Sequence, residues 1–234
     1  MLLVISISQS VYAGVVLFQQ GTVFPDSTWN NFYNSQPGVS SSIISSSSTI
    51  TSASLASVDL FIAATPVNTY STAEASALST FLTGGGNMLL LGEHSGFPTE
   101  NGYVNSLLSA MGSGMSLAGG AYDCGPQIAN ASQTVGSLTV AGMSYGCSST
   151  LINGGITGLL AKDLSTILMA SEIFGAGRLT LMGDGNLGHL ANTYDEQFFM
   201  NLLEDVVPVP APAPLALMCL GLAAIGYARR RKLN

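Results

Sequence analysis

The sequence predicts an α/β domain in which helices cover both faces of a mostly parallel sheet, giving three layers. Two observations support this fold class. Apolar runs of strand length alternate with helical patterns along most of the chain, which is typical of strand–helix–strand units with right-handed crossovers. The 234 residues, 47% of them hydrophobic, also suffice for one domain of about 190 residues with a substantial core.

Five strands are predicted from short runs rich in Val, Ile, Leu, Phe and Met. They cover residues 15–18, 58–64, 88–91, 164–170 and 178–182. A serine-rich stretch, 40–57, also contains β-branched residues that favour a strand, but its composition is equally typical of disorder, and both readings stay open. From 115 to 153 a glycine-punctuated alternation predicts a β-rich insertion.

Four helices are expected, three between these strands and one after the last of them. Ser71 and Glu74 have the spacing of a capping box, and the helix that they open is expected to end at Gly84. The apolar residues expected to line the four helices are Trp29 and Phe32; Leu78, Phe81 and Leu82; Tyr103, Leu107, Leu108 and Met111; and Phe198, Phe199, Leu202 and Leu203.

The charge is distributed unevenly along the chain. All 13 acidic residues lie between Asp26 and Asp205, where Lys162 and Arg178 are the only basic residues, so this body has a net charge of −11. A surface of this sign repels phosphate backbones, and we expect no nucleic-acid partner. No calcium loop of the D-x-D-x-D-G type occurs, and we predict no metal and no cofactor.

The N-terminal segment, residues 1–13, is apolar, and Val11-Tyr12-Ala13 fits the small-residue pattern that precedes a signal-peptidase cut. Cleavage there would make the mature protein start near Gly14, and the α/β domain is expected to cover residues 14–206. The segment lacks the usual basic start, so either the signal peptide is truncated or these residues form an ordinary first strand.

The C-terminal segment, residues 207–234, has three parts. Alternating prolines over 207–214 favour an extended spacer, and 215–228 is an unbroken apolar run that predicts a hydrophobic helix. Four basic residues follow, as expected on the cytoplasmic side of a membrane. On these features alone the tail is a C-terminal membrane anchor.

The order of these three parts resembles the PEP-CTERM sorting signal of Gram-negative bacteria. Here Pro208-Val209-Pro210 stands where the usual motif has Pro-Glu-Pro. The resemblance implies processing by an exosortase, a membrane cysteine transpeptidase, after transient or lasting insertion in the inner membrane, in species that make extracellular polysaccharide. The residues that carry it are Val207, Pro208, Pro210, Arg229, Arg230, Arg231 and Lys232.

The stretch VDLFIAATPVNTYSTAEASALSTFLTGGGNMLLLGEHSG, together with GRLTLMGDGNL and YDEQFFMNLLEDVV, resembles exported members of the class I glutamine amidotransferase-like superfamily. The resemblance implies a flavodoxin-like fold. Catalytic members carry Gly-x-Cys-x-Gly after a strand, whereas this chain has Gly92-Glu93-His94-Ser95-Gly96, so no thioester amidotransfer is expected. Ser95 beside His94 is a weak alternative nucleophile, because adjacent side chains do not naturally meet.

Polar residues follow two of the predicted strands. Glu93 and His94 follow one, and Asp184, Asn186 and His189 follow another. Because the carboxyl ends of parallel strands converge on one crevice, these groups are candidates for a catalytic or polar-ligand site. The alternative is structural: Glu93 caps a neighbouring backbone, Asp184 and Asn186 shape a turn, and the histidines are solvated.

Three cysteines occur, and Cys219 lies in the tail. Cys124 and Cys147 are then the remaining pair of an exported protein, and an oxidising compartment favours a disulfide between them. The alternative is a reactive Cys124, which has no basic neighbour in the sequence to activate its thiol.

Two functions remain open. The leading interpretation is an exported envelope or matrix protein sorted by its tail, with a body that is a non-catalytic structural or interaction module. The rival is an exported hydrolase or carbohydrate-active enzyme that uses Glu93, His94, Asp184 and His189. A periplasmic solute-binding protein is disfavoured, because no second lobe is evident.

Overall fold

The computed structural model describes residues 13–24, 26–129, 138–152, 154, 158–161 and 166–204. The predicted C-terminal helix and sorting signal lie outside these residues, and so does nearly all of the predicted signal peptide. Within the described ranges, no helix is both long enough and apolar enough to span a bilayer.

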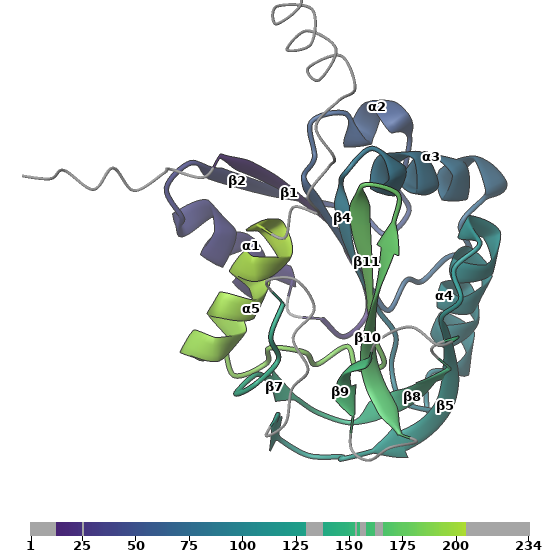
Figure 1. The fold of residues 1–234 in the computed structure, drawn as a ribbon, viewed down its shortest axis with the longest axis vertical. Coiled ribbons are helices and arrows are strands. Elements are labelled where there is room, and N and C mark those ends of the chain that lie inside the picture. The colour runs from purple at the N-terminus through teal and green to yellow at the C-terminus, as the bar shows by residue number, and fades with distance from the viewer. Residues whose placement is uncertain are drawn as a thin grey trace, which may run out of the picture.

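One seven-stranded sheet forms the centre of the molecule, in the order β2-β1-β3-β4-β11-β10-β9 (Figure 1). The first five strands of this order run parallel, and β10 and β9 run antiparallel to their neighbours. The sheet is therefore mixed and mostly parallel, as the sequence predicts. Its strands are β1 (Gly14–Gln19), β2 (Val39–Ile44), β3 (Leu60–Ala64), β4 (Asn87–Leu91), β9 (Gly158–Ala161), β10 (Ile167–Phe174) and β11 (Gly177–Met182).

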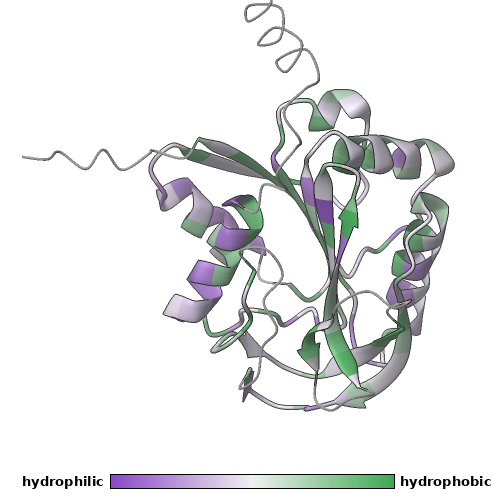
Figure 2. Cartoon of the chain, viewed as in Figure 1, coloured by the Kyte–Doolittle hydropathy of each residue, from purple (hydrophilic) through white to green (hydrophobic). Residues whose placement is uncertain are grey.

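Helices cover both faces of this sheet. α1 (Asp26–Ser35) and α5 (Thr193–Glu204) pack on one face, while α2 (Ser52–Leu55), α3 (Thr72–Thr83) and α4 (Pro98–Met111) pack on the other (Figure 1). Successive strand residues point to opposite faces, so Phe18 and Ile62 enter the first core and Leu17 and Phe61 enter the second. The central strands are accordingly mostly hydrophobic, although β4 begins with Asn87 and β11 contains Arg178 near its start (Figure 2).

Local sequence signals set several of the element ends. The capping box that opens α3 is present: Glu74 N–H donates to the Ser71 hydroxyl, and Ser71 N–H donates to the Glu74 carboxylate. α4 is capped after Met111 by Gly112, whose φ of 80° is the left-handed conformation that glycine adopts most easily. The serine-rich stretch forms strand β2 and, after Thr51, the short helix α2.

The strand predicted over 164–170 is placed differently. β10 begins at Ile167 and continues to Phe174, because it forms a hairpin with β11 in which Phe174 pairs with Gly177. The turn between them contains Gly175 with a φ of 68°. Hairpin pairing supplies the ladder partners that extend β10 beyond its most apolar residues.

Between α4 and β9, the described residues form four further strands. β5 (Ser116–Tyr122) pairs antiparallel with β8 (Ser148–Ile152), and β6 (Gln127–Ile128) pairs antiparallel with β7 (Ser144–Tyr145). Buried Asp195 of α5 holds β7 in place by accepting hydrogen bonds from the Ser144 N–H (2.6 Å) and hydroxyl (2.7 Å). These contacts bring the segment after β7 over the carboxyl end of the sheet.

Candidate functional site

The site predicted from strand ends is assembled by two neighbouring strands. Glu93 and His94 follow β4, Asp184 and Asn186 follow β11, and these strands pair in parallel. Gly185 N–H donates to Glu93 Oε2 at 3.2 Å, which links the two turns directly. A side chain at Gly185 would collide with the Glu93 carboxylate, since a Cβ there would lie 2.8 Å from Oε2.

Glu93 is 1% exposed, and both of its carboxylate oxygens accept backbone hydrogen bonds. Oε1 accepts from His94 N–H at 2.9 Å, and Oε2 accepts from Gly185. Burial raises the pKa of Glu93 to about 7; the two N–H groups oppose this rise, and the nearby Asp184 adds to it. Glu93 is thus a carboxyl group that takes up a proton near neutral pH.

His94 forms a pair with this carboxyl group. Its Nδ1 accepts a hydrogen bond from Gly96 N–H at 3.0 Å, so the neutral imidazole carries its proton on Nε2. Nε2 lies 3.9 Å from Glu93 Oε1, and about a third of the His94 side chain is exposed. The pair therefore joins one buried and one accessible titratable group.

Asp184 is fully buried, and it too is held by the backbone. Oδ1 accepts from Asn186 N–H at 2.7 Å, and Oδ2 accepts from Gly146 N–H. Burial raises the pKa of Asp184, while these hydrogen bonds and the nearby His189 oppose the rise. His189 lies farther along the same turn, where its Nδ1 donates to the Asn186 carbonyl at 3.1 Å.

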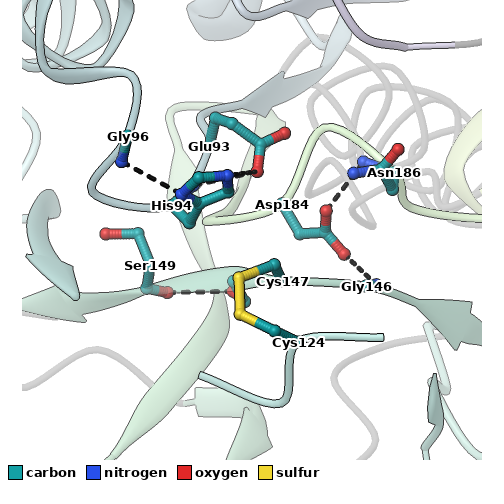
Figure 3. The surroundings of a disulfide bond; sticks show 10 residues. Glu93, His94, Gly96, Cys124, Gly146, Cys147, Ser149, Asp184 and Asn186 are labelled. Atoms are coloured by element: carbon teal, nitrogen blue, oxygen red, sulfur yellow. Dashed lines mark hydrogen bonds and ion pairs between the residues drawn. A yellow bond between two sulfur atoms is a disulfide. The ribbon is translucent and has the colours of Figure 1, made fainter. Parts of the chain in front are cut away.

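The predicted pairing of Cys124 with Cys147 is confirmed: the structure joins them by a disulfide. Figure 3 draws this bond near Glu93, His94 and Asp184. Cys147 directly follows Gly146, whose N–H binds Asp184. The disulfide consequently anchors the connection between β7 and β8 that holds Asp184, and neither cysteine is left as a free thiol.

The geometry of these strand-end residues leaves little room for metal binding or nucleophilic catalysis. Each carboxylate is occupied by two backbone N–H groups, and no cluster of three or more His, Cys, Asp or Glu in the described ranges could hold a metal ion. Ser95 is exposed, and its backbone N–H donates to the Gly120 carbonyl. Across the part of the chain that the structure describes, no hydrogen bond joins the Ser95 hydroxyl to His94, so no nucleophile–base pair forms there.

Sequence reasoning missed a second feature at the same edge of the sheet. A cavity of about 330 Å³ opens at the carboxyl ends of β1 and β3. It was missed because its walls come from three separate loops whose proximity depends on the strand order. The residues that line it are Gln19, Gln20, Ser46, Ser47, Ser48, Thr49, Ala63, Ala64, Pro66, Val67, Asn68, Thr69, Tyr70 and Glu74.

The raised pKa of Glu93 predicts a pH-dependent stability. The fold favours protonated Glu93, so its contribution is complete below pH 4.5 and is lost as the pH rises through about 7. Between pH 4.5 and 8, the free energy of unfolding should fall by about 2 kcal/mol less in Glu93→Gln than in the wild type. This figure allows for partial solvation of the Glu93 carboxyl group. Urea unfolding at a series of pH values measures this difference.

Glu204→Gln, which removes an exposed carboxylate at the end of α5, is the matched control and should follow the wild-type pH profile. Parallel profiles for the wild type and Glu93→Gln would contradict a shifted Glu93.

No protein-family model matches the chain, and no curated protein matches it. Solved structures share its fold at low identity. The N-terminal domain of mmIFT52 is 18% identical with a TM-score of 0.60, over 81% of this chain and 96% of that one. Cytoplasmic protein STM1381 from Salmonella typhimurium LT2 is 12% identical with a TM-score of 0.60, over 82% and 99%.

A β-galactosidase from Rahnella sp. R3 is similar over a shorter part of its length. It is 14% identical with a TM-score of 0.53, over 83% of this chain but 31% of the enzyme, so this chain spans about a third of that protein. At these identities the likeness extends to the fold alone.

Proposed function

We propose that this chain is an exported cell-envelope or matrix protein, sorted by its C-terminal tail, with a body that is a non-catalytic structural or interaction module. The observation that carries the proposal is the tail itself, in which a proline spacer, an apolar run and four basic residues occur in the order of a PEP-CTERM signal. The Cys124–Cys147 disulfide supports an oxidising compartment. The partner that processes the tail is then an exosortase-type transpeptidase in the inner membrane. Once sorted, the body is expected to lie among extracellular polysaccharide.

The strand-end groups support a body without catalytic activity. Glu93 and Asp184 are buried, and all four of their carboxylate oxygens accept backbone hydrogen bonds. This is the pattern of groups that stabilise turns. The strand order β2-β1-β3-β4 also fits the flavodoxin-like, amidotransferase-like architecture that we propose for the body. The same fold occurs in proteins as different as a cytoplasmic protein and part of a β-galactosidase, so the fold selects no activity by itself.

The test is to follow the mature mass and the location of the full chain and of a variant that ends at Val207. Both are expressed in bacteria with and without an exosortase gene. We expect the full chain to lose the segment beyond the proline spacer only where the exosortase is present, and to reach the cell surface or the medium there. The truncated variant should be released without processing in both strains.

Pro208→Ala/Pro210→Ala with an intact apolar run is the matched control for simple membrane anchoring. If the full chain keeps its tail and stays in the inner membrane in both strains, the tail is an anchor and the sorting proposal is wrong.

The second candidate is an exported hydrolase or carbohydrate-active enzyme. One observation favours it: the Glu93–His94 pair combines a carboxyl group of pKa about 7 with a partly exposed imidazole 3.9 Å away. Turnover of chromogenic esters or glycosides by the wild type, lost in Glu93→Gln, would establish this function in place of the first.

A further inference from the structure

The cavity between the ends of β1 and β3 lies at the topological switch point of the sheet. The chain leaves β1 toward β2 on one side, and it then crosses to β3 on the other side of β1. The loops that follow β1 and β3 therefore diverge and leave a crevice at the carboxyl ends of the two strands, the usual ligand position in open α/β sheets. Neither Glu93 nor Asp184 lines this cavity.

Hydrogen bonds between loops fix the walls of the cavity. The Tyr70 hydroxyl donates to Gln19 Oε1 at 2.5 Å, and Gln19 Nε2 donates to the Ser48 carbonyl at 3.2 Å. Asn68 Nδ2 donates to the Ser46 carbonyl at 3.2 Å. These contacts tie the loop after β2 to β1 and to the loop after β3, so the cavity is formed before any ligand arrives, which lowers the entropic cost of binding.

The lining is polar but nearly uncharged. It consists mainly of side-chain amides, hydroxyls and one phenol, and none of its residues, all of which the structure describes, is Lys, Arg or His. Its one carboxylate, Glu74, accepts from Ile50 N–H at 3.0 Å and from Ser71 N–H at 2.8 Å, so it is already used in capping α3. A phosphate or carboxylate ligand would meet this negative charge with no cation to balance it.

Several lining groups remain open for a ligand. Among the described residues, the side chains of Gln20, Thr49 and Thr69 have no hydrogen-bond partner. An amide and two hydroxyls offer both donors and acceptors, which is the chemistry that complements hydroxyl groups. The volume of about 330 Å³ is at the small end of the roughly 300–1,000 Å³ typical of ligand pockets.

We propose that this cavity binds a neutral saccharide of one or two sugar units, through Gln20, Thr49 and Thr69. The site lies in the body, so sugar binding is independent of whether the tail is processed. It gives the proposed interaction module a ligand class, and it remains testable if the sorting proposal fails.

The test uses the purified full chain and saturation-transfer difference NMR, with dissociation constants from calorimetric titration. The probes are glucose, galactose, lactose and cellobiose, with glucose 6-phosphate as the charged counterpart. We expect a neutral sugar to bind and glucose 6-phosphate to bind more weakly. The Gln20→Ala/Thr69→Ala variant should weaken binding roughly tenfold or more, because the hydroxyls of the sugar lose partners in the site.

Gln197→Ala, which removes an exposed amide on α5, is the matched control and should bind like the wild type. Thr49 is an exposed residue on the cavity wall. The variant Thr49→Trp should fill the cavity and block sugar binding, while its melting temperature stays unchanged. Absence of binding by all four neutral sugars, tighter binding of glucose 6-phosphate, or equal binding by the wild type and both site variants would each overturn the proposal.

Discussion

Trp29→Ala is expected to lower the free energy of unfolding by about 3–5 kcal/mol, which is the usual cost of removing a large buried aromatic side chain. Trp29 is fully buried in α1, and its ring stacks on Phe199 of α5 with the centroids 3.8 Å apart. Phe32 contacts it edge-on at 5.4 Å. Because α1 and α5 form one layer, the substitution leaves a cavity where the two helices meet the sheet. Trp29 Nε1 has no hydrogen-bond partner within the described ranges, so the lost stability comes from packing and not from a hydrogen bond.

The measurement is urea unfolding followed by far-UV circular dichroism, since Trp29 is the only tryptophan and its fluorescence is lost with it. Tyr194→Ala is the control, because this aromatic ring on α5 is 63% exposed and its removal should cost about 0.5 kcal/mol or less. Equal losses in the two variants would show that the contact between α1 and α5 does not hold the layer together.

Removal of the disulfide, by Cys124→Ser together with Cys147→Ser, is expected to lower the free energy of unfolding by about 3 kcal/mol. The bond joins residues 23 positions apart, and opening a loop of this length releases chain entropy in the unfolded state. We also expect the effect to reach the candidate site. Gly146 adjoins Cys147 and donates to buried Asp184, which would lose a fixed partner if this segment loosened.

Unfolding of the oxidised protein, with and without dithiothreitol, measures the contribution of the bond. The double serine variant serves as the control, because the reductant should leave its stability unchanged. If dithiothreitol lowers the stability of both proteins equally, the loss is unrelated to the bond between Cys124 and Cys147.

The elements that the sequence predicted well are those specified by local patterns. Ser71 and Glu74 are three residues apart and form the capping box of α3, so four consecutive residues suffice to predict where this helix starts. β3 is a continuous apolar run and β4 is apolar after Asn87, because helices cover both faces of these strands. The extent of β10 could not be predicted this way, since Glu172, Ile173 and Phe174 are strand residues through their pairing with β11.

The position of the candidate site could be predicted from the sequence, but the hydrogen bonding of its carboxylates could not. Glu93 and Asp184 each lie one residue beyond the glycine that follows a strand, so their proximity follows from the parallel pairing of β4 and β11. The occupation of their oxygens could not be foreseen, because the donors Gly185 and Gly146 come from segments far from their acceptors in sequence. The switch-point cavity was hidden for the same reason, since strand order is a property of the whole sheet.

The position of β11 has a consequence for when the chain can fold. β11 lies inside the sheet, between β4 and β10, although among the described residues it is the last strand to be synthesised. Until residues 177–182 are synthesised, β4 has an open edge. Asn87 at the start of β4 pairs in the sheet with Arg178, which lies far along the chain. A growing chain therefore cannot complete its central sheet early. Until then the open edge of β4 can pair with other chains, so completion of the central sheet follows synthesis of nearly the whole described body.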